Sequence, residues 1–288
     1  MNHLKTLFLM TVLTVLFVIA GGAIAGEVGV FIALAFALVM NVTMWWSSDS
    51  IAVRMTRSRP LSRAEAPELH RMVERLSQRA SIPVPKLYLQ PSAQPNAFAT
   101  VRNPRHAAVA VTEGLLRQLD SREVEGVIAH ELAHIKHYDT LISTVAAVFA
   151  GALAALARIG TWGMMFGGGR GRNNGNMLTL LLAIIFAPMA AMLIRMAVSR
   201  SREFAADRRA AEIAGSPAGL MSALSKLDSL SQRSRMQVNE AASHMYIVNP
   251  LRGSGGMAAL FSTHPPMDAR ISRLRRLESR SARTARIR

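Results

Sequence analysis

The chain has 288 residues, half of them hydrophobic, yet its formal net charge is +16 at pH 7. This combination is unusual for a soluble enzyme and fits a protein that lies partly in lipid, with basic residues facing an anionic membrane surface. The Lys and Arg residues flank apolar segments without a recognition module, so nucleic acid is not an expected partner. Because there is no Cys, disulfides and thiolate metal ligands are excluded, and a metal would need His and carboxylate ligands.

Two uncharged segments, Thr6–Gly26 and Val28–Ser48, open the chain. Each has about the 20 residues that a membrane-spanning helix needs, so residues 1–48 are predicted to form a transmembrane hairpin. Lys5 precedes this hairpin and four arginines follow it, whereas its turn has no basic residue, which places both ends in the cytoplasm. In an alternative, Ala23-Ile24-Ala25 is a signal-peptidase site and the first segment is a cleaved signal peptide.

A soluble part, residues 49–139, follows the hairpin. Residues Ala64 to Ala80 have the apolar spacing of an amphipathic helix. Ser121 is the expected N-cap of a later helix. Between them, three stretches with strand-like patterns predict a small antiparallel sheet, and these are Lys86–Gln90, Asn96–Val101 and Ala107–Val111.

The later helix contains the main chemical motif, His130-Glu131-x-x-His134. The two histidines are four residues apart and would lie on one helix face, where two imidazoles can bind the same zinc ion. Glu131 would lie beside the open position of the metal, where it can take a proton from water and pass it to a leaving amine. A solvated helix face is the alternative. The apolar neighbours argue against it, because unpaired polar groups are costly in a buried helix.

A second pair of uncharged segments, Thr140–Ala157 and Met177–Ile194, follows the motif. Each has about 18 residues, the lower limit for a membrane span. Residues 140–199 are therefore predicted to form a second hydrophobic hairpin, either transmembrane or packed against the soluble part. In both versions the chain returns to the side of the membrane that it left.

The second soluble part, residues 200–288, begins with a helix that carries Glu203 and Asp207 on one face. In one interpretation these carboxylates form local ion pairs with Arg202 and Arg208. In the other, Glu203 is the third metal ligand and Asp207 accepts a hydrogen bond from a ligand histidine. Three protein ligands would leave one zinc position open, as in catalytic sites.

Several motifs together resemble one known family, the HtpX-type membrane zinc metalloproteases, which are relatives of the CAAX prenyl protease. The chain departs from the family pattern at Val101, where the family often has Gly. Besides the hairpin and the two-histidine motif, the matching segments are Asn96-Ala97-Phe98-Ala99-Thr100, Ser201-Arg202-Glu203-Phe204-Ala205-Ala206-Asp207 and Thr263-His264-Pro265-Pro266, in the family's order.

The resemblance implies a mainly α, zincin-like integral membrane metalloprotease with a small antiparallel sheet and two hydrophobic hairpins. It implies one zinc ion per chain, bound by His130, His134 and Glu203, with Glu131 as general base and His264 near the reacting carbonyl. The implied activity is cleavage of misfolded or damaged membrane proteins during stress and quality control. The implied location is the bacterial inner membrane, with the catalytic parts facing the cytoplasm.

The sheet edge that includes Asn96-Ala97-Phe98, or alternatively the stretch Ala107–Val111, is predicted to bind substrate as an added strand through main-chain hydrogen bonds. Arg270 is a weaker match to the family than His264, which could otherwise belong to a surface turn. Two other functions stay open at this point. One is a protease specific for a single processing site. The other is a membrane-anchored adaptor in which zinc only ties the two soluble parts together, and His137 or His264 as a fourth ligand would favour it.

Overall fold

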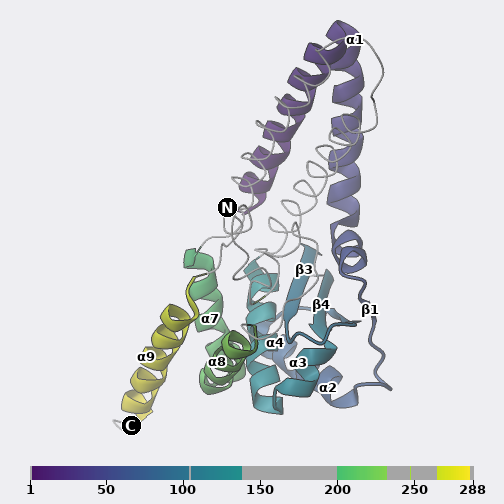
Figure 1. Cartoon of the computed structure of the whole chain (residues 1–288). Helices are drawn as coiled ribbons and strands as arrows, with labels where there is room; N and C mark the ends of the chain where they lie inside the picture. Colours follow the sequence, from purple (N-terminus) through teal and green to yellow (C-terminus); the bar gives the residue numbers. More distant parts are fainter. Residues whose placement is uncertain (1, 104, 138–199, 232–246, 248–264, 286–288) are drawn as a thin grey trace.

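The structure is a computed structural model, and it describes residues 2–103, 105–137, 200–231, 247 and 265–285 (Figure 1). The predicted second hairpin, residues 140–199, and His264 lie outside the described residues. In chain order the elements are α1 (Asn2–Met55), β1 (Arg59–Pro60), α2 (Pro67–Ala80), β2 (Lys86–Gln90), β3 (Ala97–Asn103), β4 (His106–Thr112), α3 (Glu113–Gln118), α4 (Ser121–His137), α7 (Arg200–Ala214), α8 (Ala218–Ser231) and α9 (Met267–Ala285).

Helix α1 reverses its direction at Gly26, so its two halves form two arms (Figure 1). Nδ2 of Asn41 donates a hydrogen bond to Oγ1 of Thr14 at 2.9 Å, although the residues are 27 positions apart. A straight helix would separate them by about 40 Å. Gly26 has a φ of +61°, in the left-handed region that glycine adopts without steric cost.

The arms of α1 differ in how much apolar sequence they hold. Among the described residues, Gly26–Thr43 is the one segment long and apolar enough to cross a membrane, and Met10–Ile19 is a shorter apolar stretch. The sequence predicts two hydrophobic hairpins. By length and apolar composition, however, the described residues contain a single candidate span. Large apolar side chains such as Phe8 and Phe31 are exposed on both arms, which suits contact with lipid.

The sheet is mixed, so the predicted antiparallel sheet is wrong. Its strand order is β1-β2-β4-β3, and β4 pairs antiparallel with β3 but parallel with β2. The chain leaves β2 through residues 91–96, forms β3 at the far side, and returns as β4 between the two. β4 is buried at every position after His106. A strand that is buried on both faces belongs in the middle of a sheet, which explains why β4 lies between β2 and β3.

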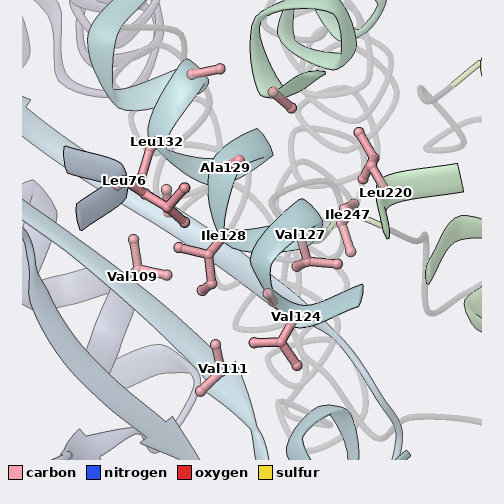
Figure 2. Close-up of a cluster of buried hydrophobic side chains, with 14 of the residues drawn as sticks. Leu76, Val109, Val111, Val124, Val127, Ile128, Ala129, Leu132, Leu220 and Ile247 are labelled. Carbon is pink, nitrogen blue, oxygen red and sulfur yellow. The ribbon is translucent and has the colours of Figure 1, made fainter. Parts of the chain in front are cut away.

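Helix α4 is the centre of the hydrophobic core. It packs against β3 on one side and against α7 and α8 on the other. Figure 2 shows Ile128 near Leu76 and Val109, while Val127 points toward Leu220. These five side chains are at most 1% exposed, and full burial of each contributes about 1.5–3 kcal/mol. The core therefore sets the rotation of α4 about its own axis.

Asp120 is the N-cap of α4, so the prediction of Ser121 for this role is wrong by one residue. Oδ1 of Asp120 accepts hydrogen bonds from the backbone N–H groups of Arg122 and Glu123, each at 2.9 Å. Oε2 of Glu123 accepts the backbone N–H of Asp120 at 2.9 Å. This reciprocal capping box satisfies donors at the start of the helix that carries the two-histidine motif.

Helices α4 and α8 approach each other closely at two glycines. A Cβ atom on Gly126 would lie 2.4 Å from the backbone nitrogen of Leu220, and one on Gly219 would lie 2.3 Å from the carbonyl oxygen of Arg122. The crossing joins residues that precede and follow positions 138–199. It holds the two soluble parts of the chain together as one core.

Candidate metal centre

Helix α4 presents His130 and His134 on one face, one turn apart. Their rings are nearly perpendicular, with centroids 4.7 Å apart and an interplanar angle of 89°. The two Nε2 atoms lie 3.1 Å from each other. His130 is 1% exposed, so its imidazole lies in the protein interior. This agrees with the burial that the apolar neighbours of the motif predict.

Helix α7 adds Glu203 to the two histidines. Its Oε2 lies 3.7 Å from Nε2 of His130, and its Oε1 lies 3.5 Å from Nε2 of His134. One ligand atom from each of the three residues can be chosen so that all lie within 4.8 Å of one another. The packing of α4 on α7 thus brings together residues that are about 70 positions apart in the sequence.

The donor atoms fit a divalent metal ion such as zinc. Zinc holds nitrogen and oxygen at about 2.0–2.2 Å, so two of its tetrahedral ligands are about 3.3–3.6 Å apart, close to the spacings above. Burial, and then the charge of Arg270, lowers the pKa of His130 to about 4, which keeps its ring neutral at pH 7, as coordination requires. Among the described residues the cluster has three members, and the exposed His137 is not one of them.

Asp207 lies one turn after Glu203 and contacts His130 on the side away from the cluster. Its Oδ1 is 3.1 Å from Nδ1 of His130. Arg270 of α9 donates to both oxygens, from Nε to Oδ2 at 2.9 Å and from Nη2 to Oδ1 at 2.6 Å. Burial would raise the pKa of Asp207, but the charge and hydrogen bonds of Arg270 outweigh it and lower the pKa to about 2. Asp207 is therefore an ionised acceptor for Nδ1–H, which leaves Nε2 of His130 for a metal.

Arg270 is fully buried. Besides Asp207, it contacts two of the three residues of the cluster. Its Nη2 lies 3.3 Å from Nε2 of His130, and its Nη1 lies 3.9 Å from Oε2 of Glu203. The sequence holds a signal for this burial. Arg270 falls on the apolar stripe of α9 with Met267 and Leu274, both buried, where an unpaired arginine would be costly.

Glu131 is 2% exposed and lies where α4 meets β3. Burial raises the pKa of Glu131 to about 7; the charge of His134 opposes this shift and the charge of Glu203 adds to it. The backbone N–H of Ala99 donates a hydrogen bond to the carboxylate. Near neutral pH the group is therefore present in both protonation states, as suits a general acid–base group.

The segment Asn96-Ala97-Phe98 lies at the start of β3, with all three residues at most 1% exposed. The carbonyl oxygen of Ala97 accepts the backbone N–H of Ile247 at 3.1 Å. The carbonyl oxygen of Ile247 in turn accepts Nη1 of Arg270 at 3.3 Å. The main chain of this segment therefore pairs with another part of the same chain, whereas its side chains are packed inside.

Comparison with known proteins identifies the family to which this site belongs. The sequence profile described as Peptidase family M48 matches residues 63–278. The chain belongs to peptidase family M48. This M48 chain is a membrane metalloprotease of the HtpX type, a hydrolase of peptide bonds, as the resemblance implied.

The M48 relatives at high identity match nearly end to end. A protein named Protease HtpX homolog from Pelotomaculum thermopropionicum is 53% identical over 95% of this chain and 98% of its own length. The homologue from Salinibacter ruber is 51% identical over 98% of this chain and all of its own. The homologue from Pyrococcus furiosus is 50% identical over 95% of each.

A solved structure, that of S. mikatae Ste24p, has a similar fold. It superposes with a TM-score of 0.52 at 17% sequence identity, over 95% of this chain and 65% of that chain. The chain thus spans less than two thirds of Ste24p. At this identity the likeness concerns the fold alone, and it supports the arrangement of helices around a small sheet.

Proposed function

We propose that the protease binds one zinc ion through His130, His134 and Glu203 and cleaves peptide bonds with Glu131 as general base. The observation that carries this proposal is the convergence of these ligand atoms within 4.8 Å beside a buried glutamate. When bound, zinc supplies a Lewis acid that polarises the scissile carbonyl and activates water. Asp207 and Arg270 hold the His130 ring in the tautomer and orientation that this binding needs.

The proton transfers are assigned to Glu131. Its carboxylate accepts a proton from the attacking water and passes it to the nitrogen of the leaving amine. Burial raises the pKa of Glu131 above its ordinary value, which makes the carboxylate a better acceptor for the proton of water. The Ala99 N–H keeps the carboxylate oriented between steps. His264, by the family resemblance, is proposed to stabilise the developing charge on the substrate oxygen or to bind a substrate carbonyl.

The edge of β3 is proposed to bind the substrate in an extended conformation. The segment Asn96-Ala97-Phe98 would pair through its main chain, which reads little of the substrate sequence and suits broad specificity. The carbonyl oxygen of Ala97 accepts the backbone N–H of Ile247, so this part of β3 already pairs with a main-chain group, and a substrate strand would take the place of that contact.

The location and the substrates are proposed from the membrane anchor and from the family resemblance. Residues 49–139 and 200–288 are proposed to form one catalytic domain on the cytoplasmic face of the bacterial inner membrane, anchored by hairpins 1–48 and 140–199 in a multi-pass arrangement. Basic residues at both ends of the first hairpin support this orientation. The proposed substrates are misfolded or damaged membrane proteins, in cooperation with other quality-control proteins.

The direct test is cleavage of casein, an unfolded model protein, by the detergent-purified full chain. Activity should require zinc and disappear with chelator. Glu131→Gln should keep one bound zinc but lose at least about 100-fold in turnover, the scale of general base catalysis. Glu125→Gln is the matched control, with the same chemical change on the same helix. Normal turnover of Glu131→Gln would refute the general-base role, and metal-independent cleavage would refute the zinc site.

A second assay addresses the substrates. A membrane protein reconstituted with the protease is offered in its native form and after partial unfolding, and the product bands are mapped. Quality control predicts faster cleavage of the unfolded form at several sites. Cleavage of the native form at one site would instead identify a processing protease.

A further inference from the structure

A cavity of about 220 Å³ lies between α7 and α9, on the side of α7 that carries Phe204 and Arg208. Apart from Asp207, its lining consists of apolar and of basic side chains. Phe204, Leu274 and Leu277 supply apolar surface, and Arg208, Arg273 and Arg276 supply three guanidinium groups.

The positive charge of this cavity is not neutralised by the parts of the chain that the structure describes. Within those parts, Arg208, Arg273 and Arg276 make no ion pair with a carboxylate, and all three are exposed. Asp207 also lines the cavity, but both of its oxygens accept hydrogen bonds from Arg270. The wall of the cavity therefore carries three positive charges next to its opening to solvent.

One of the three guanidinium groups has its position set by an aromatic ring. The Cζ atom of Arg273 lies 3.6 Å from the centroid of Phe204, in a cation–π contact. This contact occupies one face of the guanidinium plane and leaves its N–H edge for a ligand. A planar arginine held in this way can donate two parallel hydrogen bonds to a phosphate.

We propose that this cavity binds the headgroup of an anionic phospholipid. Three arginines match a phosphate diester, and the apolar lining matches the glycerol and first acyl carbons next to it. The cavity is smaller than the roughly 300–1,000 Å³ of pockets for drug-sized ligands, so the headgroup enters while the acyl chains stay outside.

The position of the cavity agrees with a lipid ligand. In Figure 1 the N-terminal end of α7, which carries Phe204, lies at the end of the soluble part from which α1 projects. If α1 is the membrane anchor, this end faces the lipid surface, so the inference rests on the proposed membrane topology. A headgroup between α7 and α9 would also hold α9 in place, one turn from the contact between Arg270 and Asp207.

The test is equilibrium binding of dioctanoyl phosphatidylglycerol to the full chain in a neutral detergent, compared with dioctanoyl phosphatidylcholine. The double variant Arg208→Gln and Arg273→Gln should weaken phosphatidylglycerol binding about 25-fold, since each basic residue near an anionic lipid is worth about fivefold. The matched control is Arg209→Gln with Arg275→Gln, which removes the same charge from the same two helices outside the cavity. This control should change binding by less than about threefold, the scale of long-range charge effects in salt.

Further arms identify the source of the phosphate. Equal binding of the two lipids by the wild-type chain, or equal weakening by both double variants, would overturn the proposal. Inorganic phosphate or an acidic peptide that binds as tightly as phosphatidylglycerol would also overturn it. If the double variant does not fold, Arg276→Gln alone replaces it, with an expected fivefold loss.

The binding arm is repeated with Glu131→Gln, so that it does not depend on catalysis. Lipid binding without cleavage by the wild type would count against the proposed function and support the cavity. Cleavage without selective lipid binding would do the reverse.

Discussion

Oδ1 of Asp207 lies 3.1 Å from Nδ1 of His130, and the same oxygen accepts Nη2 of Arg270 at 2.6 Å. One carboxylate oxygen thus connects a histidine of α4 to an arginine of α9. The charge of Arg270 keeps Asp207 ionised despite its burial. The orientation of the His130 ring consequently depends on a residue from a distant part of the chain.

Arg270→Lys should therefore lower the zinc affinity of the site by about 10- to 100-fold, the usual effect of losing a partner that orients a metal ligand. Lysine keeps the charge but cannot donate from two positions of a planar group to both oxygens of Asp207. Competition with a chromophoric chelator measures the affinity. Arg275→Lys, on the exposed side of α9, is the control, and an unchanged affinity in Arg270→Lys would rule out this positioning role.

Removal of the metal should lower the thermal stability of the protein. The proposed ligands come from α4 and α7, so a bound ion links the two helices, and binding to the folded state alone raises its stability. Chelator should lower the melting temperature of the wild type, and added zinc should restore it. The variant Glu203→Ala should show a much smaller response to both, and an equal response would mean that the stabilising ion binds elsewhere.

Gly126→Ala should destabilise the protein by about 1–3 kcal/mol, the usual cost of overpacking. Alanine favours a helix over glycine by about 1 kcal/mol, but the added Cβ would lie 2.4 Å from the backbone nitrogen of Leu220. Backbone atoms cannot move aside as a flexible side chain can, so the clash outweighs the gain. A lower melting temperature in detergent is the measurement. Ser225→Ala, at an exposed position of α8, is the control, and a more stable Gly126→Ala would contradict the close crossing.

The free energy of unfolding should decrease at acid pH, in part because Glu123 becomes protonated. This residue is 2% exposed and lies between α4 and α8. Burial opposes its ionisation, but hydrogen bonds from Lys226, at 2.8 Å, and from Ser222 and the Asp120 backbone outweigh it and lower the pKa of Glu123 below its ordinary 4.5. A lowered pKa means that this contribution is present above pH 4.5 and is lost as the pH falls further.

The variant Glu123→Gln tests this pH dependence. At pH 7 it should cost about 1–3 kcal/mol, since it removes charged hydrogen bonds to a buried group. The difference in melting temperature from the wild type should shrink as the pH is lowered toward 3. Glu212→Gln, at an exposed position of α7, is the control. A difference independent of pH would show that the charge of Glu123 does not contribute.

The parts of the site that depend on local spacing could be predicted from the sequence. The helical repeat alone brings His130 and His134 to one face of α4, and Glu203 and Asp207 to one face of α7. The direction of β4 relative to β2 could not be predicted, because alternation of apolar residues indicates a strand without indicating its partner. The N-cap was misplaced because Asp120 and Ser121 are both good capping residues. The contacts of Arg270 needed the fold, since they join positions 140 residues apart.

The separation between His130 and Arg270 also bears on how the protein is made. Translation produces α4 well before α9, so a growing chain holds the two histidines while Arg270 has not yet been added. During that interval Asp207 lacks the guanidinium that offsets the cost of burying its charge. The His130 ring then lacks an Asp207 carboxylate held in place by Arg270. The contact that fixes the His130 ring is therefore among the last of the site to form, because it waits for position 270 to be synthesised.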